Sequence, residues 1–454
     1  MVDVGEISNP SSNFSEMFTS ASKAASSNPD GTGPALERAM STPSTQHQVV
    51  VLDEEEDIAD YRPNGYHPVH IGDIYNNRYQ VVRKLGWGHF STVWLAKVLE
   101  EDAETLRYVA LKIMRSAPHY TEAAKDEIEI LRRVKEADLS HPGHHHVVTI
   151  EDSFIHEGVN GKHVCMTFEV LGASLLSLMR RFNQNGIPEP LVKQITKQIC
   201  CGLDYLHRIC GVIHTDLKPE NILIELPGLD WSNQDLEQPY SEGCFDSVII
   251  PSRPLSFPLN ELHISVKIAD LGNGCWFNKH FSNDIQTREY RAPEVILGSK
   301  WGASVDAWSL GCMVFELITG DYLFEPQAGT RFSKNDDHIA QIIELLGRLP
   351  LSLLLQGQWT QLYFDQNGQL RNIFRLEEWS LFDVFVDKYG YAVKDAKLAC
   401  DFMLPLLALN PLLRADAGGM SNHPWLEGVC SQLHIDRPLK GPGSDINGWV
   451  LNAE

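Results

Sequence analysis

The strongest constraint on the fold is a change of residue pattern near residue 120. Before it, segments rich in Val, Leu and Trp alternate as β-strands do, and turn residues separate them. These strand-like segments are residues 79–86, 91–98 and 108–114. From residue 121 apolar residues recur at helical spacing, and helical patterns dominate to residue 426. We therefore predict an α+β fold with a small β-rich N-lobe, residues 79–170, and a larger α-helical C-lobe, residues 171–426.

Segments at both ends and within the C-lobe lack this periodicity. Residues 1–60 are rich in Ser, Asn, Thr, Pro and Gly and close on an acidic run, so we expect a disordered tail. Residues 225–262 are rich in turn residues, which predicts a short insertion between two strands of the C-lobe. Residues 427–454 follow the last helical pattern and are expected to form a C-terminal extension.

Charge indicates the kind of partner, and cysteine content indicates the compartment. The 454 residues include 60 Asp and Glu against 38 Lys and Arg, a formal charge of −22, which favours a basic protein partner over nucleic acid. The nine cysteines form no CxxC pair, which indicates a reducing compartment without a disulfide frame or zinc site. The first residues lack a signal-peptide pattern, and no apolar run reaches about 18 residues. We expect a soluble monomer of the cytoplasm and nucleus, without membrane contact.

A glycine-rich turn lies between the first two strand patterns. Gly86 and Gly88 would leave backbone amides open to phosphate oxygens, although the turn alone is equally typical of an ordinary hairpin. Further on, Lys112 lies on an apolar strand pattern and Glu127 lies on the helical pattern that follows. Since a lysine on a buried strand needs a counter-charge or a phosphate, we expect Glu127 to pair with Lys112.

The most specific cluster is the segment 214–221. Asp216, Lys218 and Asn221 place a carboxylate, an ammonium and an amide in one loop. Such a set can accept a hydroxyl proton, steady a γ-phosphate and hold a metal. Asp270 ends another apolar strand pattern just before a glycine, a position suited to Mg²⁺ ligation.

Each of these motifs is weak alone, but their order is informative. The order of the motifs along the chain matches that of the protein-kinase signatures. In sequence, these motifs are the glycine turn, Lys112, Glu127, the segment 214–221, the strand that ends at Asp270, and residues 292–294. The chain resembles a eukaryotic protein kinase over residues 79–426, which implies the bilobal kinase fold and the use of ATP and Mg²⁺. Lys218 and Thr287 look like the serine/threonine class. The resemblance also implies that Arg414 pairs with the glutamate of the 292–294 motif.

Longer segments resemble the SR-protein kinases, which phosphorylate arginine/serine-rich splicing factors, and the chain looks like a fungal-type member. These segments are residues 65–97, 212–223, 267–276 and 315–329. Thr215 stands where most kinases have Arg and Leu271 stands where most have Phe, and both departures recur in that family. No arginine lies next to Asp216 that could bind a phosphate on the activation segment. We therefore expect the protein to be active without phosphorylation of that segment.

The kinase resemblance assigns roles to the site residues. Lys112, held by Glu127, would orient the ATP phosphates. Asp216 would accept the seryl proton, and Lys218 would stabilise the transferring phosphoryl group. The residues expected to bind Mg²⁺ are Asn221 and Asp270. The residues expected to bind ATP are Leu85, Gly86, Gly88, Ser91, Val93, Lys112, Glu169 and Leu171.

The resemblance to the SR-protein kinases also implies substrate contacts. Asp337 and Glu344 lie seven residues apart on a helical pattern, hence on one face, and with Lys388 they match an acidic docking groove in that family. A solvated helix face is the alternative for these two carboxylates. An arginine-rich peptide would complement such a groove.

Three residues of the expected activation segment are further substrate candidates. Arg288 and Arg291 flank the expected peptide-binding turn and could receive phosphoserines already made. For Arg291, packing against carboxylates of the C-lobe is an equal alternative. Thr287 is expected to contact the catalytic loop.

Two alternative functions stay open from the sequence. A dual-specificity splicing kinase would share the DLGNxCW strand, although the EHLAMMER hallmark of those kinases is absent. A catalytically silent docking protein would hold Arg-rich chains in the acidic groove, although it would need none of the catalytic residues.

Overall fold

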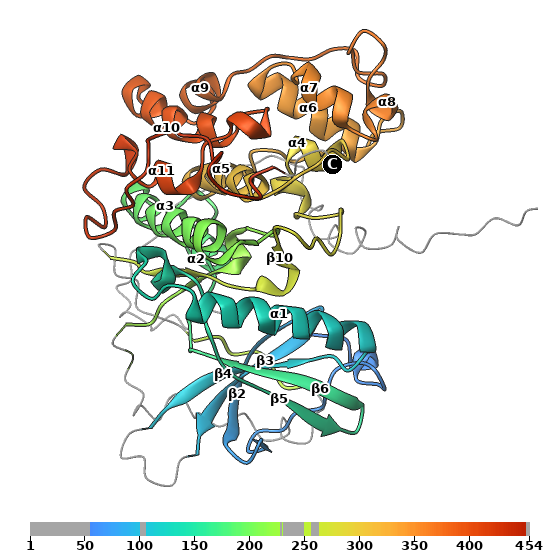
Figure 1. Cartoon of the computed structure of the whole chain (residues 1–454), viewed down its shortest axis with the longest axis vertical. Helices are drawn as coiled ribbons and strands as arrows, with labels where there is room; N and C mark the ends of the chain where they lie inside the picture. The colour runs from blue at the N-terminus through green and yellow to red at the C-terminus, as the bar shows by residue number, and fades with distance from the viewer. Residues whose placement is uncertain (1–54, 100–105, 228, 230–248, 256–262, 451–454) are drawn as a thin grey trace, which may run out of the picture. The chain divides into compact units, whose positions relative to one another are not determined.

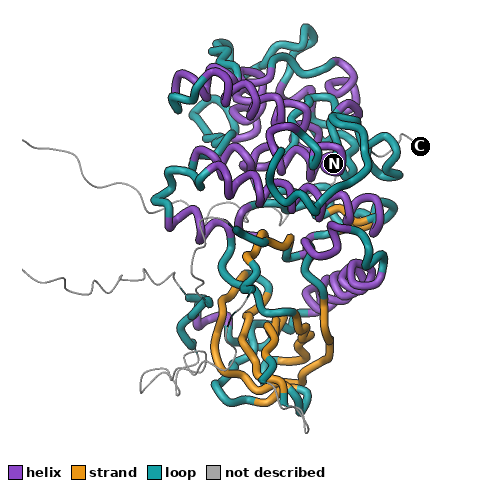
Figure 2. Tube along the Cα trace, turned by 90° about the vertical axis from the view of Figure 1, so that its left-hand side faces the viewer, coloured by secondary structure: helices purple, strands orange, loops and turns teal. Residues whose placement is uncertain are grey.

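The computed structural model describes residues 55–99, 106–227, 229, 249–255 and 263–450. The N-lobe is built around one antiparallel sheet, and the C-lobe is built mainly from helices (Figures 1 and 2). The predicted α+β fold of two lobes is confirmed.

Six strands form the N-lobe sheet, in the order β1-β2-β3-β4-β6-β5. They are β1 (Ile74–Tyr75), β2 (Tyr79–Gly88), β3 (Ser91–Val98), β4 (Tyr108–Met114), β5 (Ile150–Gly158) and β6 (Gly161–Phe168). Two short strand pairs lie in the C-lobe: β7 (Val212–Ile213) with β10 (Cys275–Trp276), and β8 (Ile222–Ile224) with β9 (Val266–Ile268). The three strands predicted between residues 79 and 114 are β2, β3 and β4.

Helix α1 (Pro118–Glu136) follows β4 and packs against the sheet (Figure 1). The C-lobe helices are α2 (Leu175–Arg181), α3 (Glu189–Asp204), α4 (Pro293–Ile296), α5 (Ser304–Thr319), α6 (Lys334–Leu346), α7 (Leu351–Gln356), α8 (Thr360–Tyr363), α9 (Leu381–Asp383), α10 (Val393–Leu406) and α11 (Ala417–Met420). Short turns of other helix types include η1 (Ile58–Asp60), η2 (Pro142–His146), η3 (Tyr205–Cys210), η4 (Pro219–Asn221), η6 (Leu271–Asn273), η7 (Arg288–Tyr290), η8 (Val384–Lys388), η9 (Pro411–Leu413) and η10 (Pro424–Leu426). None of the helices described is long and apolar enough to cross a membrane.

Strand β4 is buried on both faces because separate layers cover the sheet. On one side α1 contributes Ile128 and Leu131 to a core that continues into the C-lobe. On the other side Val69 and Ile250 pack onto the strands. A strand covered on both sides carries a nearly continuous apolar run, which explains the sequence YVALKIM of β4.

Helix α5 is the centre of the C-lobe core. All sixteen of its residues are buried, and α3 and α10 pack against it. A helix surrounded in this way is apolar on all sides, and its few charged residues need partners. The two charged residues of α5, Asp306 and Glu316, lie beside the candidate active site described below.

The ordered chain extends further toward the N-terminus than the sequence indicated. Residues 55–60, expected in the disordered tail, include the turn η1, and the carboxylates of Glu55 and Glu56 contact Lys84 Nζ at 2.7 and 2.5 Å. This corrects the expected tail boundary at residue 60, because Lys84, Arg115 and Ser252, which are distant in the sequence, bind the acidic residues of this segment. The rest of the expected tail, residues 1–54, and most of the expected insertion lie outside the described residues.

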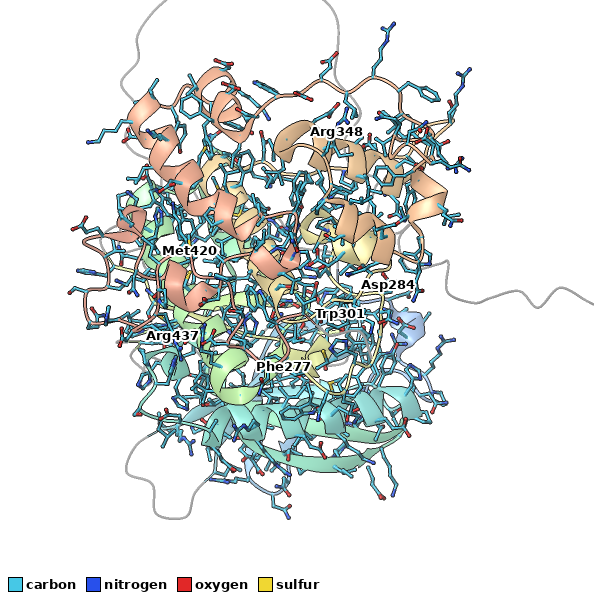
Figure 3. All side chains as sticks on the ribbon, turned by 45° about the horizontal axis from the view of Figure 1, so that its top comes forward. Phe277, Asp284, Trp301, Arg348, Met420 and Arg437 are labelled. Carbon is cyan, nitrogen blue, oxygen red and sulfur yellow. The ribbon has the colours of Figure 1, made fainter. Side chains whose placement is uncertain are left out.

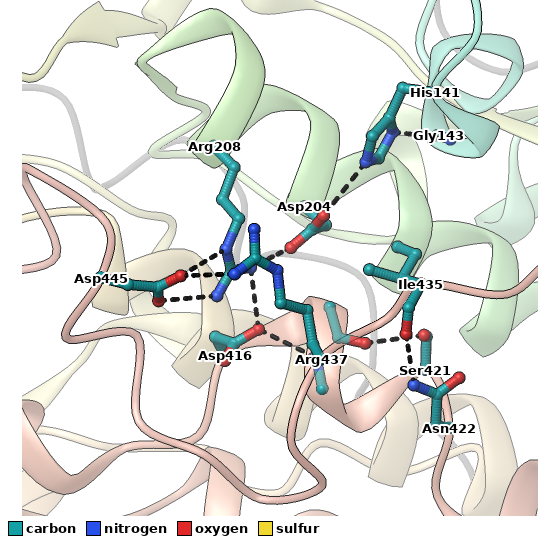
Figure 4. A network of polar contacts seen from close by, with 12 residues as sticks. His141, Gly143, Asp204, Arg208, Asp416, Ser421, Asn422, Ile435, Arg437 and Asp445 are labelled. Atoms are coloured by element: carbon teal, nitrogen blue, oxygen red, sulfur yellow. Dashed lines mark hydrogen bonds and ion pairs between the residues drawn. The ribbon is translucent and has the colours of Figure 1, made fainter.

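The C-terminal extension is an integral part of the C-lobe as far as residue 450. Trp449 is 3% exposed, and its ring N–H donates to the carbonyl of Pro411 at 3.1 Å. Arg208 joins the extension to the helical core, since its guanidinium contacts Asp445 and Asp416, each at 3.0 Å (Figure 4). The extension therefore covers surface that would otherwise face water.

Candidate active site

The catalytic segment, residues 214–221, lies between β7 and β8 and contains Asp216. One carboxylate oxygen of Asp216 accepts from Lys218 Nζ at 2.8 Å. The other accepts from the hydroxyl and the amide of Thr287 at 2.7 and 3.2 Å. Asn221 Nδ2 donates to the backbone carbonyl of Asp216 at 2.8 Å. The structure thus brings together the expected carboxylate, ammonium and amide and places Thr287 against them.

Asp306 on α5 fixes the backbone of this segment. Its oxygens accept the amides of His214 and Thr215 at 2.8 and 2.9 Å and contact His207 Nε2 at 2.8 Å. Burial raises the pKa of Asp306, but His207, His214 and the amide hydrogen bonds outweigh it and lower the pKa. Thr215 has a φ of 66°, a conformation that branched side chains resist, so its neighbours must hold it there. Sequence reasoning missed this positioning role of Asp306.

Lys112 on β4 and Glu127 on α1 form the expected ion pair. Lys112 Nζ lies 2.8 Å from Glu127 Oε1 and 3.5 Å from Asp270 Oδ1. Burial would lower the pKa of Lys112, but these two carboxylates raise it, so the side chain stays an ammonium. Burial, together with Asp270, raises the pKa of Glu127. This is the lysine–glutamate contact that phosphoryl transfer in protein kinases requires.

Asn221 and Asp270, the expected magnesium ligands, are tied together by the backbone. The amide of Ala269 donates to the carbonyl of Asn221 at 2.8 Å. Because Asn221 Nδ2 bonds to the catalytic segment, its carbonyl oxygen Oδ1 is the atom suited to a metal. No three His, Cys, Asp or Glu side chains among the described residues are grouped so that they could hold a metal. Two oxygen ligands fit Mg²⁺ that arrives with a nucleotide, since phosphates and water complete its shell.

The glycine turn connects β2 to β3, with Gly86 opposite Val93 and Gly88 opposite Ser91. A Cβ atom at either glycine would meet no protein atom within 4 Å, so packing alone does not require glycine there. The open space beside the backbone is instead what phosphate groups need. The other expected ATP-binding residues on β2 and after β6 are Leu85, Glu169 and Leu171.

Arg288 and Arg291 lie close together in the activation segment, residues 270–294. Arg288 Nη1 donates to Asn335 Oδ1 at 2.5 Å, whereas Arg291 pairs with Asp284 at 3.0 Å and donates to the carbonyl of Gln286. Burial and the neighbouring Arg291 lower the pKa of Arg288 to about 10, and burial lowers the pKa of Arg291. Two positively charged side chains that lie this close together favour the binding of an anion next to them.

The expected docking residues lie on two separate elements. Asp337 and Glu344 share one face of α6, and each carboxylate accepts a backbone N–H from a neighbouring loop, at 2.8 and 3.0 Å. Lys388 lies in η8 and pairs with Asp321 at 3.0 Å rather than with either acid of α6. The two acids stay partly exposed, and the docking role of all three residues stays a prediction.

Sequence reasoning missed an acidic cluster, formed by Glu220, Glu289 and Glu316, beside the catalytic segment. Glu316 on α5 is 4% exposed and accepts from the Tyr290 hydroxyl at 2.5 Å. Burial, Glu220 and Glu289 raise the pKa of Glu316 to about 8, although the bond from Tyr290 lowers it. Glu220 lies four residues beyond Asp216, so the crowded negative charge adjoins the catalytic carboxylate. A cation brought by a substrate would relieve this repulsion.

A cavity of about 480 Å³ separates α1 from the activation segment. Its lining includes Asp126, Thr287, Asp284 and Trp301, of which the last two are labelled in Figure 3. Lys279 of the activation segment pairs with Asp126 of α1 at 3.0 Å. The segment is therefore tied both to α1 and, through Thr287, to the catalytic loop.

Comparison with known proteins agrees with this geometry. The protein kinase domain model matches residues 79–426 of the chain. "Serine/threonine-protein kinase SRPK" of Physarum polycephalum is 46% identical, over 83% of this chain and 92% of the relative. "Protein kinase dsk1" of Schizosaccharomyces pombe is 42% identical, over 88% and 90%. "SRSF protein kinase 3" of Homo sapiens is 35% identical, over 88% and 96%.

Proposed function

Because this chain belongs to the protein kinase family, as a serine/threonine kinase of the SR-protein kinase type, we propose that it phosphorylates serines in Arg/Ser-rich proteins. A protein kinase uses ATP, and its reaction generally requires Mg²⁺. The observation that carries the proposed substrate class is the acidic cluster next to Asp216.

The catalytic segment performs the proton transfer in the proposed reaction. Asp216 accepts the proton of the seryl hydroxyl as the bond from the serine oxygen to the γ-phosphorus forms and ADP leaves. Thr287 and Lys218 fix the two oxygens of this carboxylate in place. Lys218 Nζ, 2.8 Å from the carboxylate, can also stabilise negative charge on the transferring group.

The nucleotide is oriented from the N-lobe side. Lys112, positioned by Glu127, would contact the phosphates, and the glycine turn would cover them. Asn221 and Asp270 would hold Mg²⁺, which neutralises phosphate charge when it is bound.

The acidic cluster selects arginine beside the target serine. A guanidinium keeps its charge at every physiological pH and can bond to two carboxylates in one plane. Glu220 is exposed and belongs to the catalytic segment, so an arginine bound to it would hold the adjacent serine near Asp216, while the buried Glu316 would add negative charge behind it. Further along the peptide, Asp337 and Glu344 on α6 would bind additional arginines.

Phosphoserines already formed would bind at Arg288 and Arg291. The crowding of these two cations supports an anion site, and the pairing of Arg291 with Asp284 means that a phosphate would compete with that carboxylate. Such a site would let the enzyme modify successive serines of one peptide.

Activity in this proposal does not require phosphorylation of the activation segment. The contacts of Thr287 with Asp216 and of Lys279 with Asp126 already hold the segment. Phosphatase treatment of the purified protein is expected to leave its rate on an Arg-Ser peptide unchanged. A fall of tenfold or more, reversed by incubation with ATP, would contradict this part of the account.

Phosphate transfer from Mg-ATP to an Arg-Ser repeat peptide tests the reaction itself, with Asp216→Ala as the control. Labelling of serine by the wild type and its loss in the variant are expected. Labelling of tyrosine in a matched Arg-Tyr peptide would favour a dual-specificity kinase. Tight binding of the peptide without any labelling would favour a silent docking protein.

A further inference from the structure

Two segments from distant parts of the sequence meet at β2 of the N-lobe sheet. We call residues 55–60 the N-terminal strap and residues 249–255 the docked insertion segment. Ile250 is 1% exposed in the sheet core, and Leu255 packs in a second cluster with residues of β3 and β4. The amide of Arg253 donates to the carbonyl of Lys84 at 2.8 Å. Apolar contacts near both ends therefore hold the segment against the sheet.

Lys84 on β2 is the positively charged residue at the place where the strap and the docked insertion segment meet. Its side chain is fully buried and contacts Glu55 at 2.7 Å and Glu56 at 2.5 Å. Although burial opposes it, bonds from Lys84 and Ser252 lower the pKa of Glu55, so this carboxylate is ionised. One ammonium thus faces two carboxylates, of which one is enough to balance its charge.

Glu55 is also the contact between the strap and the docked insertion segment. The amide of Ser252 donates to Glu55 Oε1 at 2.5 Å, and the Ser252 hydroxyl donates to Oε2 at 2.9 Å. The Glu55 side chain is 19% exposed, whereas that of Glu56 is fully buried. Of the two acids, Glu55 is the one that can move into water while Glu56 continues to balance Lys84.

Ser252 is followed by Arg253, and this dipeptide matches the proposed substrate class. Only one other pair of adjacent Ser and Arg occurs in the sequence, Arg115–Ser116. Ser116 is 8% exposed, and its hydroxyl donates to the carbonyl of Asn160 at 2.7 Å. Ser252 is less buried and lies on an irregular segment, which can leave the sheet more easily than the end of a core strand.

We propose that Ser252 is a phosphorylation site for the kinase's own activity, and that its phosphate separates the N-terminal strap from the docked insertion segment. The inference rests on the proposed Arg/Ser specificity. The transfer occurs between two molecules. Asp216 of a second molecule accepts the Ser252 proton, the bond from Oγ to the γ-phosphorus of its ATP forms, the bond to the bridging oxygen breaks, and ADP leaves.

The added charge explains why the contact is lost. A phosphoserine brings about −1.5 to −2 charges and replaces a hydroxyl that donates to Glu55. Three anions would then surround the single ammonium of Lys84. Because the phosphate is the strongest acceptor among them and Glu56 is buried, Glu55 is displaced and the strap loses its contact with the insertion segment.

The first test is site mapping after the full-length protein is incubated with Mg-ATP. An Asp216→Ala protein serves as substrate and a small amount of wild type serves as enzyme, so that labelling reports transfer between molecules. We expect phosphate on Ser252 and none on Ser256, which precedes Phe257. An added Arg253→Lys substitution, which keeps the charge, is expected to slow labelling of Ser252 at least tenfold. Equal labelling with Lys would overturn the role of the dipeptide.

An Arg-Ser peptide added to the same mixture distinguishes failure of this inference from failure of the proposed function. Labelled peptide with unlabelled Ser252 would overturn this inference and leave the proposed function intact. Absence of label on both would count against the proposed function itself.

Hydrogen exchange tests the structural consequence. The amides of Ala59 and Tyr66, which bond within and just after the strap, are expected to exchange about tenfold faster after Ser252 is phosphorylated. Ser252→Ala is the matched control, because it removes the hydroxyl without adding charge and should change exchange much less. Equal exchange in the phosphorylated and unmodified proteins would overturn the proposed separation.

Discussion

Buried charged residues of the C-lobe differ in whether their charges are balanced. Arg414 and Glu294 are both fully buried and form a bidentate pair at 2.6 and 3.0 Å, the pairing that the kinase resemblance implied. Glu316 instead lies among like charges, with Tyr290 as its hydrogen-bond donor. The balanced pair stabilises the fold, whereas burial and the neighbouring carboxylates raise the pKa of Glu316 to about 8.

Glu294→Gln tests the structural pair. The variant leaves the buried guanidinium of Arg414 without its counter-charge, so we expect the free energy of unfolding to fall by about 3–5 kcal/mol. Chemical denaturation measures this change. Glu157→Gln, at an exposed pair with Lys162, is the control and should unfold like the wild type. Equal stability of both variants would mean that the buried pair is dispensable.

Glu316→Gln tests the acidic cluster, since glutamine keeps an acceptor for Tyr290 but removes the charge. At about pH 9, where Glu316 is largely ionised, we expect the KM for an Arg-Ser peptide to rise about tenfold, equivalent to about 1.4 kcal/mol, with the KM for ATP unchanged. The exposed Glu325→Gln is the control.

The pH dependence of the same KM gives a second readout. With a pKa of about 8, the Glu316 carboxyl gains its charge as the pH rises from 7 to 9, while arginine stays charged. The wild-type KM should therefore fall over this range, and the KM of the glutamine variant should stay flat. Identical pH profiles would rule out a contribution of the Glu316 charge to the binding of substrate arginine.

At the scale of elements, the C-terminal extension and α5 depend on each other. The carbonyls of Gly448 and Trp449 accept the amides of Ala303 and Ser304 at 2.8 and 3.1 Å, just where α5 begins. Since Asp306 lies in the first turn of α5 and holds the catalytic segment, the extension supports the active site through that helix.

Trp449→Ala measures this support. Loss of a buried indole is expected to cost about 3–5 kcal/mol of stability, and the thermal midpoint should fall accordingly. Leu439→Ala, at an exposed position of the same extension, should leave the midpoint unchanged. A wild-type midpoint for the tryptophan variant would show that the extension does not stabilise the C-lobe.

The sequence predicted elements whose cause is local and missed those whose cause is distant. Strands β2, β3 and β4, helix α1 and the pairing of Lys112 with Glu127 follow from periodicity and motif order. The ordering of residues 55–60 depends on distant partners such as Lys84, which is 28 residues from Glu56, and Arg115, which pairs with Asp60, and no local pattern indicates these contacts. Glu316 reaches the catalytic segment only through the packing of α5, so its position in the sequence carries no signal of its role.

At the scale of the whole molecule, the formal charge of −22 acts on every encounter with a basic protein. A strongly acidic surface raises the association rate of arginine-rich substrates, and salt screens this attraction. The bound complex, in which charges lie within hydrogen-bonding distance, is screened less.

Salt dependence tests this long-range contribution. Raising NaCl from about 50 to about 300 mM is expected to lower kcat/KM for an Arg-Ser protein substrate by about tenfold, mainly through KM. The rate at saturating substrate should change less than twofold. A kcat/KM independent of salt would mean that the net charge plays no part in substrate capture.

The most direct test of the central claim is the ratio of kcat/KM for an Arg-Ser repeat peptide to that for a Lys-Ser repeat of equal length and charge. Both peptides experience the same long-range attraction, so the ratio reports the planar recognition of guanidinium by carboxylates beside Asp216. At about pH 9, where Glu316 is largely ionised, we predict a ratio above about ten, which falls toward one in Glu316→Gln. Equal values for the two peptides with the wild-type protein would contradict the assignment of Arg/Ser-rich proteins as its substrates.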